Sequence, residues 1–168
     1  MGQIISSAVA GDELSAIGLG SCIGLVIADR IAGVAGLAHV VLPDSAGKAG
    51  PPGKYADLAV PELIAELTAM GAVKRRLEAV IAGGAKMFAT GSGLDIGSRN
   101  TEQVLAALKT AKVPVRAQDT GGNRGRTARL TVGVGVSAQP AGGARIDLLS
   151  LQRIGRCSNV QTTTPKAA

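Results

Sequence analysis

The sequence predicts a single α+β domain in which mixed or antiparallel β-sheets pack against helices. Its length of 168 residues suits one compact core. Hydrophobic residues make up 46% and charged residues 18%, a balance typical of folded chains. Strand-like runs outnumber helical ones, in an irregular order that does not suggest repeated βαβ units. We expect the domain to span residues 1–155 and a polar, flexible tail to occupy 156–168.

The first elements are short and apolar. Segments 3–9 and 13–17 are separated by a turn-like Ala-Gly-Asp. A β-rich run over 23–27 follows, and 34–42 is its expected hairpin partner across the turn at 29–33. The chain therefore predicts an early antiparallel hairpin.

The first helix is predicted from about Asp57 to Met70, because apolar residues recur there at three- and four-residue spacing. Asp57 is the expected N-cap, and Pro61 must then lie close to the first turn. A strand is expected over 77–82. A second helix is predicted to start near Asn100, with Gln103 at the capping-box position.

Three further strands are predicted, and a glycine-rich loop over 120–126 joins the first two. They cover residues 113–117, 128–136 and 146–151.

Composition narrows the function classes. The net charge of +6 favours an acidic partner, and Arg124, Arg126 and Arg129 are clustered in sequence. Nucleic-acid binding is disfavoured because only Tyr55 and Phe88 could stack on bases. No segment resembles a secretory signal or a membrane span, so we expect a cytoplasmic protein without membrane insertion. Two cysteines are too few for a disulfide framework.

Cys22 is the first candidate for chemistry. The glycines at 18 and 20 allow a tight turn that could expose the thiol and aim the N–H groups near Ser21 at an oxyanion. The alternative is a small buried cysteine at the start of a strand. Both interpretations remain open from this segment alone.

His39 is the single histidine of the chain and lies in an apolar segment. Measured from the turn centre near Ile31, Cys22 and His39 come roughly opposite in the predicted hairpin. Such a pair suffices for nucleophilic catalysis, although a lone histidine is also a common hydrogen-bonded core residue. No further histidine or close cysteine would complete a zinc site, and we expect no metal.

The polar segment 119–126 is a second candidate. It could be an ordinary glycine turn between strands. It could also present backbone N–H groups and Asn123 to a substrate amide.

Several segments together, in order and over more than half of the chain, resemble the CheD family of chemoreceptor glutamine deamidases. They are Gly18–Cys22, Ala38-His39 with Leu42–Ser45, Gly53–Asp57, Ile81–Phe88, Ile96–Asn100 and Asp119–Arg126.

The resemblance implies a cysteine hydrolase fold similar to the catalytic domain of cytotoxic necrotizing toxins. It implies Cys22 as nucleophile, with its pKa lowered by His39, and His39 as base. It also implies that the substrates are methyl-accepting chemotaxis receptors, whose glutamines become glutamate. A CheC-type phosphatase is an implied partner. We expect a monomer that needs no metal or organic cofactor.

One departure from the family pattern concerns the third catalytic residue, a threonine six positions before the cysteine. This chain has Ala16 there, and neighbouring Ser15 is a possible orienter of His39 if a bulge turns it round. Three rivals follow: a non-catalytic regulator that binds receptors and the phosphatase, a hydrolase of small amides, and a basic nucleic-acid-binding module.

Overall fold

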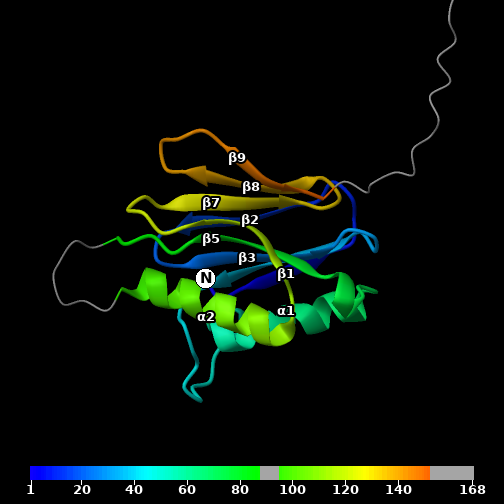
Figure 1. Ribbon diagram of the computed structural model, residues 1–168, viewed down its shortest axis with the longest axis horizontal. Coiled ribbons are helices and arrows are strands. Elements are labelled where there is room, and N and C mark those ends of the chain that lie inside the picture. The colour runs from blue at the N-terminus through cyan, green and yellow to red at the C-terminus, as the bar shows by residue number, and fades with distance from the viewer. Residues whose placement is uncertain (88–94, 152–168) are drawn as a thin grey trace, which may run out of the picture.

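A computed structural model describes residues 1–87 and 95–151. The chain forms three layers, with two helices on one face of a five-stranded sheet and a four-stranded sheet on the other (Figure 1). The predicted α+β class and single domain are confirmed. The tail expected at 156–168 lies outside the described residues.

The bounds of the elements are as follows. The strands are β1 (Ile4–Ser7), β2 (Glu13–Leu19), β3 (Ile23–Asp29), β4 (Val34–Val40), β5 (Glu78–Gly83), β6 (Val115–Thr120), β7 (Arg126–Thr131), β8 (Gly135–Pro140) and β9 (Ile146–Ser150). The α-helices are α1 (Ala56–Ala69) and α2 (Ile96–Ala111), with short 3₁₀ turns at Pro52–Lys54 and Lys74–Arg76.

The two sheets differ in how their strands are paired. The five-stranded sheet has the order β1-β4-β3-β5-β6, and only its β5–β6 pair is parallel. The four-stranded sheet has the order β2-β7-β8-β9 and is wholly antiparallel. The predicted hairpin of β3 and β4 is confirmed at the centre of the larger sheet.

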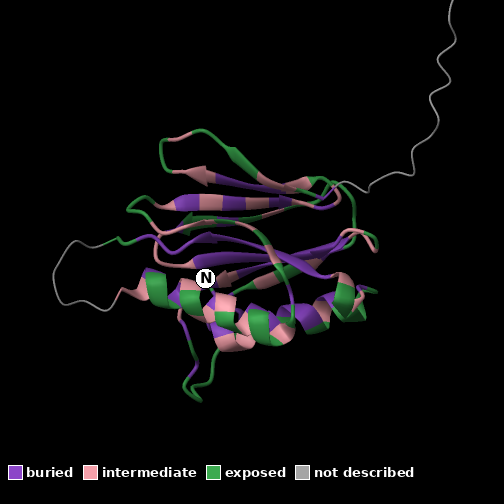
Figure 2. Cartoon of the chain, viewed as in Figure 1, coloured by how far each residue is buried: buried purple, intermediate pink, exposed green. Residues whose placement is uncertain are grey.

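The central strands β3 and β5 are buried along their whole length, because a layer covers each of their faces (Figure 2). Alternate residues of β3 serve different cores. Ile23, Leu25 and Ile27 pack against the helices, whereas Val26 and Ala28 pack against the four-stranded sheet. Residues of even number at this end of β3 therefore face the second sheet.

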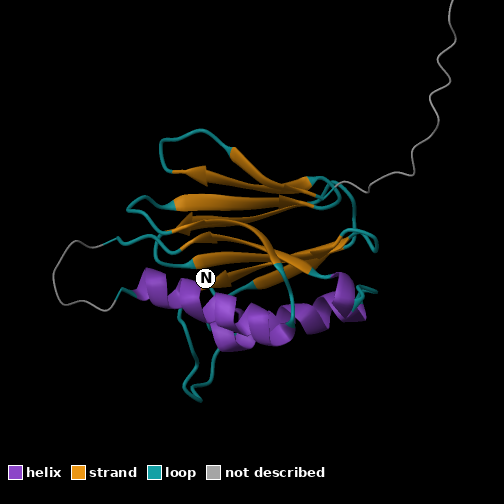
Figure 3. Cartoon of the chain, viewed as in Figure 1, coloured by secondary structure: helices purple, strands orange, loops and turns teal. Residues whose placement is uncertain are grey.

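The second helix begins earlier than the sequence predicted. It starts at Ile96, and the Asp95 carboxylate caps it by accepting a hydrogen bond from Ser98 N–H. Figure 3 shows both helices on one side of the sheets. The predicted start near Asn100 is wrong, because Asn100 lies inside the helix and is fully buried. The first helix has nearly the predicted bounds, but its N-cap is Tyr55, and the Asp57 carboxylate instead accepts two bonds from Ser45.

The strand predicted over 128–136 is in fact parts of two strands. A tight turn after β7 reverses the chain into β8, and Gly133 adopts a positive φ of 75° there. The apolar run hid this turn, because valines flank the glycine on both sides. A glycine between valines satisfies a strand pattern and a hairpin equally well.

Asp29 joins the β3–β4 turn to the segment after α1. Its fully buried carboxylate accepts hydrogen bonds from the N–H groups of Ile31, Ala32 and Val73, and Arg76 lies 2.8 Å away. Burial alone would raise its pKa, but the bonds from Arg76 and the backbone outweigh it, so the pKa is lowered.

We expect Asp29→Asn to lower the free energy of unfolding by about 3 kcal/mol at neutral pH, since it breaks a buried charge pair. A lowered folded-state pKa stabilises the protein above the ordinary pKa of 3.8, and this stability is lost as pH falls through the folded value. The difference between variant and parent should therefore shrink in acid, as urea unfolding from pH 7 to pH 2 would measure.

Glu13→Gln is the matched control, because Glu13 is more than half exposed in its 3.7 Å pair with Arg129. It should change stability by less than about 1 kcal/mol. A deficit for Asp29→Asn that stayed constant down to low pH would contradict the ionic role.

Candidate active site

Cys22 lies in the short segment between β2 and β3 and is half-buried. The end of β5 holds this segment through two backbone bonds. Gly84 N–H donates to the Cys22 carbonyl at 2.8 Å, and Ala85 N–H donates to the Gly20 carbonyl at 2.7 Å. The nucleophile candidate is thus fixed by a neighbouring strand as well as by its own turn.

Among residues 1–87 and 95–151, the N–H groups of Ser21 and Cys22 donate to no backbone carbonyl. Their carbonyls point the other way, toward β5 and α2, and the Ser21 carbonyl accepts from the side chain of Asn100 at 2.9 Å. Two adjacent N–H groups beside a thiol, neither donating to a backbone carbonyl there, are donors of the kind that an oxyanion site uses. Sequence reasoning missed Asn100, which it had placed at a helix start.

His39 lies on β4, directly opposite Gly24 of β3. Cys22 precedes Gly24 by two residues, so thiol and imidazole lie on the same face of the sheet and are diagonal neighbours. The sequence predicted that they come roughly opposite, and in the structure they are offset by two residues. No hydrogen bond joins Cys22 to His39 within the described residues, and His39 Nε2 is buried there without a partner.

A cavity of about 190 Å³ lies beside His39, between the edge of the larger sheet and β2. Ala16, 3% exposed, borders it and packs toward the space above Gly24. Ser15 also borders it but is exposed, and its bulge-free pairing with Arg129 precedes the irregularity between Ala16 and Leu19. The cavity is lined by Gln3, Ile5, Ser15, Ala16, Ile17, Leu37 and His39.

Burial shifts both ionisable groups toward their neutral forms. It raises the pKa of the Cys22 thiol and lowers the pKa of the His39 imidazole. The sequence analysis expected the opposite direction for Cys22. The arrangement therefore favours a neutral thiol and imidazole at rest, with proton transfer when the sulfur attacks.

The glycine-rich segment 120–126 and the segment that carries Cys22 are both hydrogen-bonded to the end of β5 and the residues that follow it. Gly121 N–H donates to the Gly83 carbonyl, and Lys86 N–H donates to the Gly122 carbonyl at 2.7 Å. Asn123 is exposed at the tip of this segment. The structure thus brings the two polar segments of the sequence to the same end of β5.

Arg126 does not belong to a surface basic cluster. It is only 8% exposed, lies 3.2 Å from Asp119, and donates to the Gly83 carbonyl at 2.6 Å. It is therefore an internal brace of the loop. This weakens the idea of an arginine patch for nucleic acid.

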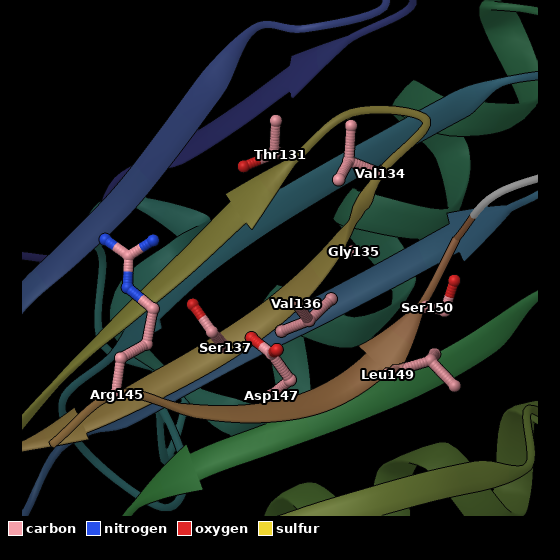
Figure 4. A pocket seen from close by; sticks show the side chains of 9 residues that line it. All are labelled: Thr131, Val134, Gly135, Val136, Ser137, Arg145, Asp147, Leu149 and Ser150. Atoms are coloured by element: carbon pink, nitrogen blue, oxygen red, sulfur yellow. The ribbon is translucent and has the colours of Figure 1, made fainter.

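Two larger hollows lie elsewhere and contain neither Cys22 nor His39. One of about 280 Å³ lies over β8 and β9, where Arg145 and Asp147 line it together with Ser137 (Figure 4). Another of about 520 Å³ lies between α1 and α2. Neither combines a thiol with an imidazole, so the Cys22–His39 region is the candidate active site.

The described part of the chain contains neither a group of potential metal ligands nor a membrane-spanning helix. In residues 1–87 and 95–151, no three His, Cys, Asp or Glu side chains are grouped to hold a metal. No helix in these residues has the length and apolar character to cross a bilayer.

Comparison with known proteins gives the family. The sequence model described as "CheD chemotactic sensory transduction" matches residues 41–138, a stretch that begins after Cys22 and His39. The chain is 50% identical over 119 residues to "Chemoreceptor glutamine deamidase CheD" of Thermotoga maritima, covering 71% of this chain and 75% of that one. It is 43% identical over 141 residues to the "Probable chemoreceptor glutamine deamidase CheD" of Clostridium novyi, covering 75% and 87%.

A third relative extends the range of organisms. The chain is 47% identical over 127 residues to a protein of the same printed name from Desulfitobacterium hafniense, covering 73% of this chain and 79% of that one. The match of the family model covers more than half of the chain, and these relatives agree with it. The chain belongs to the CheD family.

Proposed function

We propose that this protein is a glutamine deamidase that converts glutamine side chains of methyl-accepting chemotaxis receptors to glutamate and releases ammonia. The observation that carries the proposal is a half-buried thiol and an imidazole on one sheet face, beside two N–H groups that donate to no backbone carbonyl in the described residues. Relatives at up to 50% identity bear the name of this activity. The reaction is hydrolysis of a carbon–nitrogen bond in a linear amide.

In the proposed mechanism, Cys22 Sγ attacks the carboxamide carbon of a receptor glutamine while its proton passes to His39. The N–H groups of Ser21 and Cys22 stabilise the oxyanion, each by roughly 3 kcal/mol in comparable sites. His39 returns the proton to the departing ammonia, which leaves a thioester. Water, deprotonated by His39, then hydrolyses the thioester to glutamate and free thiol.

The surroundings of the site suit a protein substrate. Ile17 is 71% exposed at the cavity rim, and Met87 is about half exposed and packs against Gly20. An apolar rim on a chain of net charge +6 fits an acidic helical surface. Asn123, at the end of the neighbouring loop, would contact the substrate amide or the loops around it.

The remaining expectations from the family resemblance belong to the same proposal. They are a fold similar to the toxin catalytic domain, a CheC-type phosphatase as partner, a monomeric state and a cytoplasmic location. Burial raises the pKa of Cys22 and lowers that of His39, which favours an uncharged thiol and imidazole at rest. This agrees with a mechanism in which His39 takes the thiol proton as a general base during the attack.

The test is incubation with a purified cytoplasmic fragment of a chemoreceptor. We expect ammonia release in step with glutamine-to-glutamate conversion at defined receptor positions, read by peptide mass spectrometry. Free glutamine, offered alone at the same concentration, should give no ammonia. Equal turnover of free glutamine would instead identify a hydrolase of small amides.

A second candidate is a catalytically weak or inactive regulator that binds receptors and a CheC-type phosphatase. Ala16 favours it, because this residue has no hydroxyl to orient His39, and His39 Nε2 has no partner in the described residues. Ala16 and His39 line the same cavity. Receptor binding without ammonia release, which Ala16→Thr but not Ser15→Thr converts to turnover, would support the regulator.

A further inference from the structure

Asn100 lies at the open end of the β3–β4 hairpin, where the backbone ladder stops. The last paired residues are Ile23 and Val40. Beyond them Ser21 and Val41 make no bond to each other, and Asn100 Nδ2 donates to both of their carbonyls at 2.9 Å. One side-chain amide therefore joins the segment that carries the cysteine to the residue that follows the strand carrying the histidine.

The geometry suits an asparagine. The planar NH₂ group presents two donors in a fixed fork, and each hydrogen has its own carbonyl. The side chain is fully buried, so water cannot replace it easily. Its Oδ1 is also buried and has no partner among residues 1–87 and 95–151, which leaves the two donated bonds as its contacts there.

Close packing of α2 on β5 brings Asn100 to this point. A Cβ on Gly97 would lie 2.5 Å from the Gly84 carbonyl oxygen, so the helix begins in direct backbone contact with the strand end. Gly84 in turn donates to the Cys22 carbonyl. The helix, the end of β5 and the cysteine segment thus form one packed unit.

We propose that Asn100 is a positioning residue, which fixes Cys22 relative to His39 by clamping the open end of the hairpin. Cys22 is one residue from the Ser21 carbonyl, and His39 is two residues from the Val41 carbonyl. The pair is diagonal, and no hydrogen bond joins it directly in the described residues. Without the clamp, the bonds that remain to this segment from other elements in the described residues are those from Gly84 and Ala85 N–H.

This inference rests on the proposed function for its catalytic part, but the thiol can be followed independently. In Asn100→Ala the Cys22 segment should loosen and expose the thiol. Alkylation of Cys22 by iodoacetamide at pH 8 should therefore become faster, while deamidation falls. We expect kcat to fall roughly 100-fold with KM unchanged, as for a displaced reacting group.

Leu108→Ala is the matched control. Leu108 is fully buried on the same helix, about 12 Å further along it, and packs in the core between helices and sheet. It should lower the melting temperature at least as much, yet leave alkylation and kcat unchanged below the transition. Asn100→Leu, which keeps the side-chain size and removes the donors, replaces Asn100→Ala if that variant does not fold.

The outcomes separate the two proposals. Faster alkylation with a lower kcat supports the clamp, and faster alkylation in a protein that never deamidates still supports it while the proposed function fails. Unchanged alkylation in folded Asn100 variants overturns the clamp, whatever the deamidation rate. Equal effects of Leu108→Ala on alkylation would overturn it too.

Discussion

Replacing Cys22 with alanine is expected to reduce ammonia release from a receptor fragment to the rate of the enzyme-free blank. Without the sulfur no thioester can form, and Cys22 is the one free cysteine of the described residues. Loss of a nucleophile typically costs on the order of 10⁴-fold or more in kcat. Initial rates of ammonia release at saturating receptor fragment would measure it.

Cys157→Ala is the control for general effects of removing a thiol, and it should keep the parent rate. Cys157 lies outside the described residues, in the polar tail beyond the proposed domain. Cys22→Ala should fold normally, because the side chain is half-buried and alanine leaves only a small gap. A folded Cys22→Ala protein that still converts receptor glutamines would eliminate Cys22 as the nucleophile.

The hairpin that holds the candidate pair was predictable because its signals are local. Two β-rich runs flank a short turn, and alternation along each run assigns residues to faces. The sequence alone placed Cys22 and His39 roughly opposite, whereas in the structure His39 pairs with Gly24, two residues after Cys22. A register of this kind depends on where the turn closes, which in this protein Asp29 decides through bonds to Ile31 and Ala32.

The parts that the sequence did not predict depend on contacts between distant segments. The sequence predicted Asn100 at the start of a helix, yet it lies inside α2 because Asp95 provides the cap. Arg126 read as surface charge, yet Asp119 and the Gly83 carbonyl hold it inside. Both are buried polar groups whose partners come from other elements, and spacing along one segment does not show such pairing.

Gly83 is the residue at which the separate parts of the site meet. It ends β5 with a positive φ of 121°, and a Cβ added there would overlap the carbonyl oxygen of Cys22. Its own carbonyl accepts from Gly121 N–H and from Arg126. The cysteine segment and the glycine-rich loop are therefore both placed by this one backbone position.

Gly83→Ala is accordingly expected to lower the free energy of unfolding by about 3 kcal/mol or more and to bring deamidation close to the blank. The positive φ contributes about 1–2 kcal/mol of this, and the forced movement of the cysteine segment contributes the rest. Gly71→Ala separates the two terms, because Gly71 has a similar φ of 98° and open space around its missing Cβ. Gly71→Ala should lower the free energy of unfolding only by the contribution of the positive φ, and it should leave the deamidation rate unchanged. Urea unfolding and ammonia release would be measured on both variants. Equal losses of stability and of deamidation rate in the two would mean that the contact with Cys22 has no consequence. Because Cys22 cannot keep both its bond from Gly84 and its distance from a new methyl group, we expect the Gly83 variant to lose the geometry before it loses the fold.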